Sequence, residues 1–218
     1  MNINKAIILS FALSTTMYSM QIKAQCSQVL HKKAFDICYS NKNKTPIYVK
    51  YTAYKTLVDK NNFKRKHIRF KSDKKISKYF RAYNNDYLRT GYDKGHLAPN
   101  ALFDYDKKIQ RETFLLSNIA PQKPQLNRRL WNKLERFVRL QAKKYGKLEI
   151  ATGVCGNVGT IKNGVVIPKW WYKIIEYPNG HRIGFLAPNT NHNMSKAKIK
   201  DFIVDIDRIE RVCKVKVF

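Results

Sequence analysis

One histidine in this chain has a setting suited to acid–base chemistry. His96 ends the run Asp93-Lys94-Gly95-His96, which brings an acid, a base and a glycine together in a short turn-prone element. A neutral imidazole titrates near physiological pH and can take a proton from a water molecule that attacks phosphorus. The other four histidines have no comparable neighbours. His96 is therefore the candidate general base.

A second group of candidate residues follows on one predicted helix. Asn127 and Glu135 are eight residues apart, and at about 100° per residue their side chains project within about 80° of one another. With Trp131 and Arg139 they form an i, i+4 row, which would present an amide oxygen, a carboxylate and a guanidinium. In the alternative interpretation Asn127 only caps the helix, and Glu135 and Arg139 form an exposed ion pair worth about 0.2–1 kcal/mol.

This set of side chains suits one hydrated metal ion. Mg²⁺ gives up its water reluctantly, so a single neutral amide together with phosphate oxygens can hold it. Such an ion can stabilise the charge that develops on a leaving 3′ oxygen. A two-metal site would need a denser cluster of carboxylates than a chain with 15 Asp+Glu offers. We therefore expect one Mg²⁺ ion, with Mn²⁺ able to substitute.

The composition indicates a folded domain with a polyanionic partner. The 218 residues suit one domain, and 44% hydrophobic with 12% aromatic residues argues against disorder. The 43 Lys+Arg give a formal net charge of +28, which favours nucleic acid because cations displace counterions from phosphates. Anionic glycans or membrane surfaces are the alternatives. Dispersed Lys and Arg contact phosphates rather than bases, so sequence preference should be weak.

The first 24 residues have the pattern of a signal peptide. Lys5 precedes the apolar run from Ala6 to Leu13, and Ala24 is a small residue before a cleavage point. The run is too short to span a bilayer. We expect an exported protein, periplasmic or secreted, with no membrane attachment after cleavage. A buried N-terminal helix is the alternative.

Four cysteines follow the expected cleavage point, and an even number in an exported chain suggests disulfides. Three connectivities are possible, of which the simplest joins Cys26 to Cys38 and Cys155 to Cys213. Because the chain has no C-x-x-C pair, a zinc ribbon is not expected.

Hydrophobic periodicity predicts an α+β fold with a largely antiparallel sheet. Residues 25–46 are rich in lysine and asparagine and are expected to be a leader, with the folded domain over residues 47–218. The basic stretch 59–78 is either a solvated loop face or a track for phosphates. Strands are expected at 47–54, 148–152, 171–177 and 181–187, and helices at 126–144 and 205–212.

Three blocks of the sequence together resemble a known family. They read DKGHLAP from Asp93, ETFLLSNIAPQ from Glu112 and LNRRLWNKLE from Leu126. Their order and spacing are similar to those of the sugar-non-specific DNA/RNA endonucleases with a ββα-metal motif, relatives of mitochondrial endonuclease G. Weaker similarity runs from about Ile47 to the C-terminus. The resemblance implies a ββα-metal endonuclease fold, a central largely antiparallel sheet flanked by helices.

The resemblance also implies particular roles for single residues. His96 would be the general base and Asn127 the one direct protein ligand of a Mg²⁺-like ion. Glu135 would hold a metal-bound water, and Arg139 would contact the scissile phosphate. Asn118 would brace the site rather than react.

Asp93 and Lys94 complete the candidate catalytic set, with Lys94 and Arg139 as substrate contacts. Lys94 stands where the family more often carries arginine. Lysine keeps the charge but loses the bidentate fork, so its grip on a phosphate should be geometrically looser.

The expected activity is exported, metal-dependent cleavage of DNA and RNA with little sequence specificity, giving 5′-phosphate ends. One alternative is a catalytically weak basic protein that binds nucleic acid or another polyanion on the same fold. A toxin or effector would use the same chemistry and differ only in delivery. The sequence leaves open the preferred nucleic acid and the oligomeric state.

Overall fold

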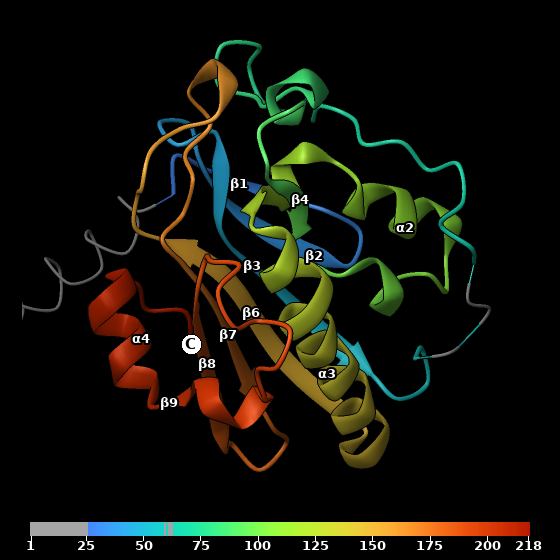
Figure 1. The fold of residues 1–218 in the computed structure, drawn as a ribbon. Coiled ribbons are helices and arrows are strands. Elements are labelled where there is room, and N and C mark those ends of the chain that lie inside the picture. The colour runs from blue at the N-terminus through green and yellow to red at the C-terminus, as the bar shows by residue number, and fades with distance from the viewer. Residues whose placement is uncertain (1–25, 59, 61–62) are drawn as a thin grey trace, which may run out of the picture.

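The computed structural model describes residues 26–58, 60 and 63–218, and a seven-stranded sheet lies at its centre (Figure 1). Every neighbouring pair of strands in it is antiparallel, as expected. In spatial order the strands are β1 (Gln28–His31), β2 (Phe35–Ser40), β3 (Thr45–Tyr54), β6 (Lys147–Cys155), β7 (Trp170–Glu176), β8 (Arg182–Pro188) and β9 (Ile203–Val204).

The central strands form where alternation or a turn signal predicted them. In β3 the side chains of Val49, Tyr51 and Ala53 alternate and are at most 4% exposed, because residues two apart lie on one face of a strand. The expected hairpin is present as β7 and β8, whose register pairs Glu176 with Arg182 across the turn. The predictions for β3, β6, β7 and β8 are confirmed.

The structure corrects the prediction that residues 25–46 form a leader ahead of the folded domain. This stretch contributes β1, β2 and the start of β3 to the sheet. Leu30, Phe35, Ile37 and Tyr39 are all buried. Their alternation is the strand signal, and the lysines and asparagines that gave the segment its polar composition lie between these positions or in the turns. The folded domain therefore starts before residue 47. The predicted signal peptide, residues 1–24, falls outside the described residues.

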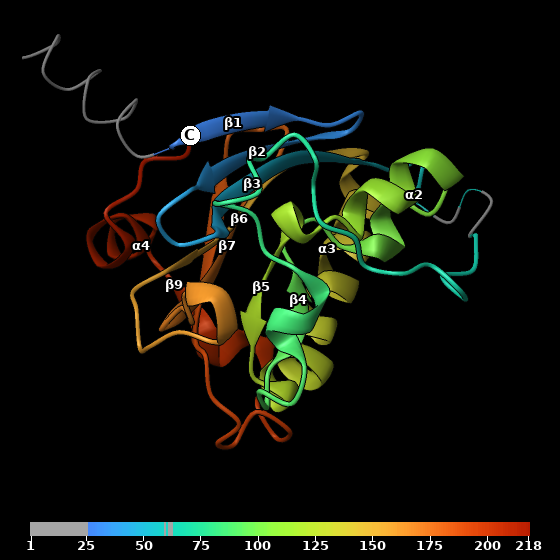
Figure 2. The same cartoon turned by 90° about the horizontal axis from the view of Figure 1, so that it is seen from above.

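Two helices pack on opposite faces of the sheet (Figures 1 and 2). The helix α3 (Asn132–Tyr145) buries Leu134, Val138 and Ala142 in the larger core, and it ends at Gly146, which has a φ of 86° that glycine adopts without strain. On the other face α4 (Ile206–Cys213) buries Ile209 against a second cluster. Both helices were predicted from the sequence.

A small two-stranded sheet and the helix α3 together form the ββα unit. The strand β4 (Asp93–His96) pairs antiparallel with β5 (Ile119–Gln122), and α2 (Lys107–Thr113) lies between them in the chain. No side chain fits at Gly95, since a Cβ there would stand 2.5 Å from Gln122 Oε1 and 2.7 Å from Trp171. The π-helical turn η4 (Leu126–Trp131) then leads into α3. The expected α+β fold with this unit is confirmed.

Short 3₁₀ helices and two disulfides complete the architecture. The 3₁₀ helices are η1 (Asn84–Tyr87), η2 (Asn100–Leu102), η3 (Leu116–Asn118), η5 (Lys162–Gly164) and η6 (Ile199–Phe202). The disulfides join Cys26 to Cys38 and Cys155 to Cys213, which is the simplest of the three expected connectivities. Among the described residues, none of the helices has the length and apolar character needed to cross a membrane.

Candidate active site

A polar cleft of about 660 Å³ lies where β4, the start of α3 and the loop before β4 meet. Six of the seven residues predicted from the sequence line it, and the seventh, Asn118, is buried behind it. The predicted residues in the lining are Asp93, Lys94, His96, Asn127, Glu135 and Arg139. The ββα unit thus brings residues of β4 to the same cavity as helical residues that lie 31 or more positions further along the chain.

His96, at the end of β4, packs against two aromatic rings that also contact each other. Its ring centroid lies 5.4 Å from that of Phe70 and 5.1 Å from that of Phe114, the latter edge-on. Burial, together with the nearby charge of Arg65, lowers the pKa of His96 to about 3. The imidazole is therefore neutral at physiological pH and able to accept a proton. Its Nε2 is buried and has no hydrogen-bond partner among the described residues.

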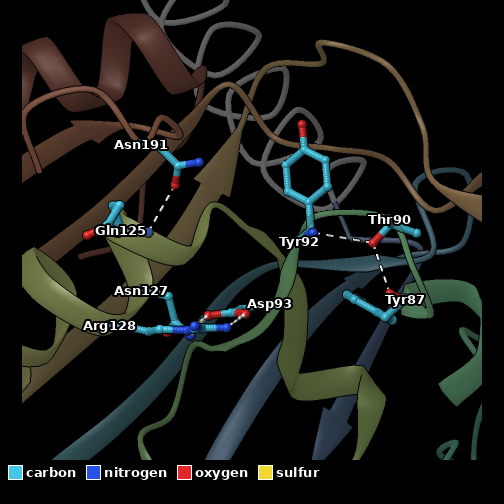
Figure 3. A network of polar contacts seen from close by, with 8 residues as sticks. All are labelled: Tyr87, Thr90, Tyr92, Asp93, Gln125, Asn127, Arg128 and Asn191. Atoms are coloured by element: carbon cyan, nitrogen blue, oxygen red, sulfur yellow. Dashed lines mark hydrogen bonds and ion pairs between the residues drawn. The ribbon is translucent and has the colours of Figure 1, made fainter.

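Asp93 joins β4 to the π-helical turn, as Figure 3 shows. Asn127 donates its side-chain Nδ2 hydrogen to Asp93 over 2.9 Å. Arg128 donates to both carboxylate oxygens, over 2.8 and 2.7 Å, a bidentate geometry that favours the ionised acid. Burial opposes ionisation of Asp93, yet the hydrogen bonds from Arg128 and Asn127 bring its pKa below the ordinary value.

The row of side chains predicted on the helix is changed by the π-helical turn. Asn127 does not cap the helix, because its own backbone N–H already bonds to Lys123 O over 2.9 Å. The wider π turn brings residues five apart to one side, so Asn132 follows Asn127 into the cleft. Trp131, expected in the row, is 1% exposed and belongs to the core. From Asn132 onward the α-helical spacing presents Glu135 and Arg139 to the same cavity.

Glu135 is a partly buried carboxylate surrounded by cations. Burial raises the pKa of Glu135 to about 7, against the opposing charges of Lys173, Arg139 and Arg65. The alternative of an exposed Glu135–Arg139 ion pair is wrong, because Glu135 is not exposed and, within the described part of the chain, no ion pair of 4.0 Å or less joins the two side chains.

Asn118 braces the loop that follows His96. Its Oδ1 accepts from Ala98 N over 2.9 Å, and its Nδ2 donates over 2.9 Å to Ala98 O and to Thr113 O. The side chain is 0% exposed. The amide thus ties the backbone two residues beyond His96 to the end of α2.

Lys94 lies against the aromatic wall of the cleft. Its Nζ stands 5.3 Å from the ring centroid of Phe70 and 5.6 Å from that of Tyr87, within the range of cation–π attraction. Burial lowers the pKa of Lys94. The two rings restrict where this flexible cation can lie, which offsets part of the geometric looseness expected for lysine in this position.

Sequence reasoning missed four charged or amide residues of the lining: Arg65, Asn100, Arg128 and Asn132. Arg65 stands in the basic stretch 59–78 and was not separated from its neighbours there. Arg128 carries a usable signal, because it follows Asn127 directly and is the cation nearest the candidate ligand in sequence. Asn132 could not be found from a helical wheel, because only the π turn directs it to the cleft.

The donor set fits a hydrated divalent cation held by few protein atoms. Among the described residues no three His, Cys, Asp or Glu side chains converge on a point that could hold a metal. Asn127 Nδ2 is committed to Asp93, so its Oδ1 is the atom left to face a cation. A neutral oxygen with water and phosphate oxygens suits Mg²⁺ or Mn²⁺.

Known nucleases are similar to this chain over most of its length. A mitochondrial nuclease of Saccharomyces cerevisiae is 31% identical over 210 residues, covering 83% of this chain and 62% of that protein. Human mitochondrial endonuclease G is 28% identical over 202 residues, covering 85% of this chain and 67% of that protein. The chain therefore spans about two thirds of the length of these relatives.

A solved structure shares the fold. A chain in the crystal structure of the EndoG/EndoGI complex matches with a TM-score of 0.81 at 28% identity, over 92% of this chain and 90% of that one. The family model described as DNA/RNA non-specific endonuclease matches residues 13–218. Because the family match covers the residues that form the cleft, and the relatives and the fold agree with it, the chain belongs to the DNA/RNA non-specific endonuclease family.

Proposed function

We propose that this protein is a metal-dependent endonuclease that hydrolyses phosphodiester bonds of DNA and RNA with little sequence specificity and leaves 5′-phosphate ends. The observation that carries the proposal is that a neutral His96 and the free amide oxygen of Asn127 line the same cationic cleft. The net charge of +28 supplies the affinity for a polyanion.

His96 is the general base in this mechanism. Its Nε2 is buried, so Nδ1 is the nitrogen that meets the attacking water, and the imidazole hydrogen resides on Nε2. Because burial keeps the resting ring neutral, it can accept the proton of the attacking water, and that proton is released to solvent before the next turnover. Phe70 and Phe114 fix the ring plane and keep bulk water from its edge.

Asn127 would hold one Mg²⁺ ion through Oδ1, and Glu135 would orient a water bound to it. When bound, this ion supplies positive charge beside the leaving 3′ oxygen. The contribution of the chain is orientation: Asp93 fixes the amide of Asn127, and Arg128 keeps Asp93 ionised. Mn²⁺ would satisfy the same oxygen donors.

The cations of the cleft would hold the scissile phosphate. Arg139 lies one helical turn beyond Glu135, Lys94 stands against its aromatic neighbours, and Arg65 also lines the cavity. None of these contacts requires a 2′-hydroxyl or a particular base, which supports action on both nucleic acids.

Export to the periplasm or the medium is part of the proposal. Its supports are the apolar N-terminal pattern and two disulfides, which persist in oxidising compartments. Several relatives are named mitochondrial, so compartment needs its own measurement. We expect to recover the protein from the exported fraction, with a mass equal to that of a chain that begins at residue 25.

The proposal is tested by digestion of supercoiled plasmid and structured RNA side by side, with and without EDTA. The wild type should cut both, EDTA should abolish cutting, and Mg²⁺ or Mn²⁺ should restore it. His96→Ala should cut at least about a hundredfold more slowly while binding DNA nearly as well. His181→Ala, which removes an exposed histidine far along the chain, should cut like the wild type.

Two results would overturn the proposal. Near wild-type cleavage by His96→Ala would show that His96 is not the general base. Cleavage that resists EDTA would show that the reaction does not need a metal ion. Tight binding without cleavage by the wild type under any divalent ion would favour the basic binding protein on the same fold.

A further inference from the structure

A lysine is buried in the sheet against Trp131, outside the lining of the cleft. Lys173 belongs to β7 and its residue is 0% exposed. It shares the face of the sheet that carries Trp171 and Ile175, which belongs to the core under α3. Lysine is almost never fully buried unless it is paired, so other groups in the fold must compensate the charge of this ammonium.

The near contacts of Lys173 are neutral. Its Nζ donates to Tyr51 Oη over 2.8 Å and to Thr152 Oγ1, and it stands 5.3 Å from the ring centroid of Trp131. Among the described residues, no recorded ion pair joins Lys173 to an acid. The hydroxyls and the indole therefore fix the position of Nζ without neutralising its charge.

The anion that this charge faces is Glu135. Glu135 follows Trp131 by four residues on the same helix, so it stands one turn from the indole that covers Nζ. Burial lowers the pKa of Lys173, and the charge of Glu135 opposes that effect. In turn Lys173 is the first of the three cations that oppose protonation of Glu135, ahead of Arg139 from α3 and Arg65 from the loop before β4.

We propose that Lys173 is a positioning residue: its ammonium, held by Tyr51 and Thr152 beneath Trp131, balances the Glu135 carboxylate from inside the fold and fixes its place in the cleft. This inference rests on the proposed function, in which Glu135 orients a metal-bound water. Arg139 and Arg65 lie on the cleft side and would meet phosphate when substrate binds. Lys173 does not line the cavity, so substrate phosphate does not compete with Glu135 for it.

Replacement of Lys173 by methionine should leave the fold intact. Tyr51 Oη and Thr152 Oγ1 are already hydrogen-bonded to each other over 3.1 Å and keep that bond once Nζ is gone, and methionine fills a similar volume. Removing one partner of a fully buried charge pair can strongly destabilise a fold, but Glu135 is only partly buried and keeps Arg139 and Arg65 as opposing charges, so the variant should still fold. An effect on catalysis can then be separated from unfolding.

A double-mutant cycle tests whether Lys173 acts through Glu135. We expect Lys173→Met to lower kcat/KM on plasmid about tenfold in the wild-type background and less than about twofold in Glu135→Gln, because the partner is then already lost. Lys169→Met, which removes an exposed cation four residues away, should change neither background. Equal losses from Lys173→Met in both backgrounds would overturn the proposal.

A second measurement does not depend on activity or on metal. In protein labelled with ¹³C and ¹⁵N at its lysines, the Nζ signal of Lys173 is the one missing from Lys173→Met, or displaced in Thr152→Val if the methionine variant does not fold. We expect this signal to shift and its titration to move to lower pH in metal-free Glu135→Gln. A Lys173 signal and titration unaffected by Glu135→Gln would overturn the proposal.

The two measurements separate this inference from the proposed function. If the wild type cuts nucleic acid but the cycle is additive and the signal is insensitive, Lys173 is only part of the core. If the signal responds to Glu135→Gln but the wild type does not cut any nucleic acid, the electrostatic pairing stands and the proposed function fails.

Discussion

Asn127 donates its side-chain amide hydrogen to Asp93 over 2.9 Å, although the two residues are 34 positions apart. The bond crosses from the first strand of the ββα unit to the π-helical turn before its helix. The bond turns Nδ2 of Asn127 toward the carboxylate of Asp93. The Oδ1 of Asn127 is then the atom left to bind a cation. An aspartate in β4 thereby determines the donor that Asn127 presents.

Loss of the Asp93 charge should weaken metal use. In Asp93→Asn we expect the Mg²⁺ concentration for half-maximal cleavage to rise about 10–100-fold, the usual effect of removing a group that orients a metal ligand. Arg128 would also lose its bidentate partner. The measurement is plasmid cleavage against Mg²⁺ concentration. Asp36→Asn removes an exposed carboxylate that pairs with His31 and is the control; an unchanged Mg²⁺ dependence in Asp93→Asn would contradict the orienting role.

Cleavage should decline as the pH falls below about 7. The pKa of Glu135 is raised to about 7 by burial, so below that pH the carboxylate gains a proton and can no longer accept a hydrogen from water. The pKa of His96 is lowered to about 3, so its protonation lies below this range. A profile of kcat/KM from pH 5 to 9 measures the decline. Full activity at pH 5 would show that ionised Glu135 is not required.

The lowered pKa of His96 also predicts how the stability of the fold depends on pH. Between about pH 6.5 and 3 the unfolded chain binds a proton at His96 and the folded chain does not. Acid therefore favours the unfolded state, and the contribution of this residue to stability falls by at most about 1.4 kcal/mol per pH unit. Urea unfolding of wild type and His96→Asn at pH 7 and pH 5 measures it. A difference between the two proteins that is the same at both pH values would contradict it.

The fold could be predicted where periodicity was regular. The alternation in β3 and the apolar spacing of Leu134, Val138 and Ala142 were legible because each element buries one face. β1 and β2 were missed because they are short and surrounded by lysine and asparagine, so composition over the whole segment outweighed the alternation of Ile37 and Tyr39. Pairing with β3, a tertiary interaction, is what stabilises them.

The site was predictable as a set of residue types but not as a set of contacts. His96, Asn127 and Glu135 were identified from chemistry and helical spacing. The π turn, however, moves Trp131 into the core and Asn132 into the cleft, and nothing in the local sequence specifies that extra residue per turn. Lys173 and Arg65 reach Glu135 from other elements, which a single-sequence pattern does not place.

Asn118 should matter for stability as much as for activity. Its side chain makes three hydrogen bonds of 2.9 Å with no exposure to water. Asn118→Ala would strand the N–H and C=O of Ala98 and the carbonyl of Thr113, at a cost of about 1–3 kcal/mol for each group left unsatisfied. Chemical denaturation measures the loss, with the exposed Asn85→Ala as control. Equal midpoints for the two variants would show that water takes over these bonds.

The two disulfides should differ in how much they stabilise the fold. Cys155–Cys213 closes a loop of 58 residues and Cys26–Cys38 one of 12, and chain entropy assigns roughly 4 and roughly 3 kcal/mol to loops of these lengths. Urea denaturation of the two double-alanine variants should show the larger loss for Cys155/Cys213. The cleft should keep its activity in that variant at low temperature, because Cys213 packs with α4 on the face of the sheet opposite α3. Inactivation of a variant that is still folded would mean that the tether of α4 acts on the cleft through the sheet.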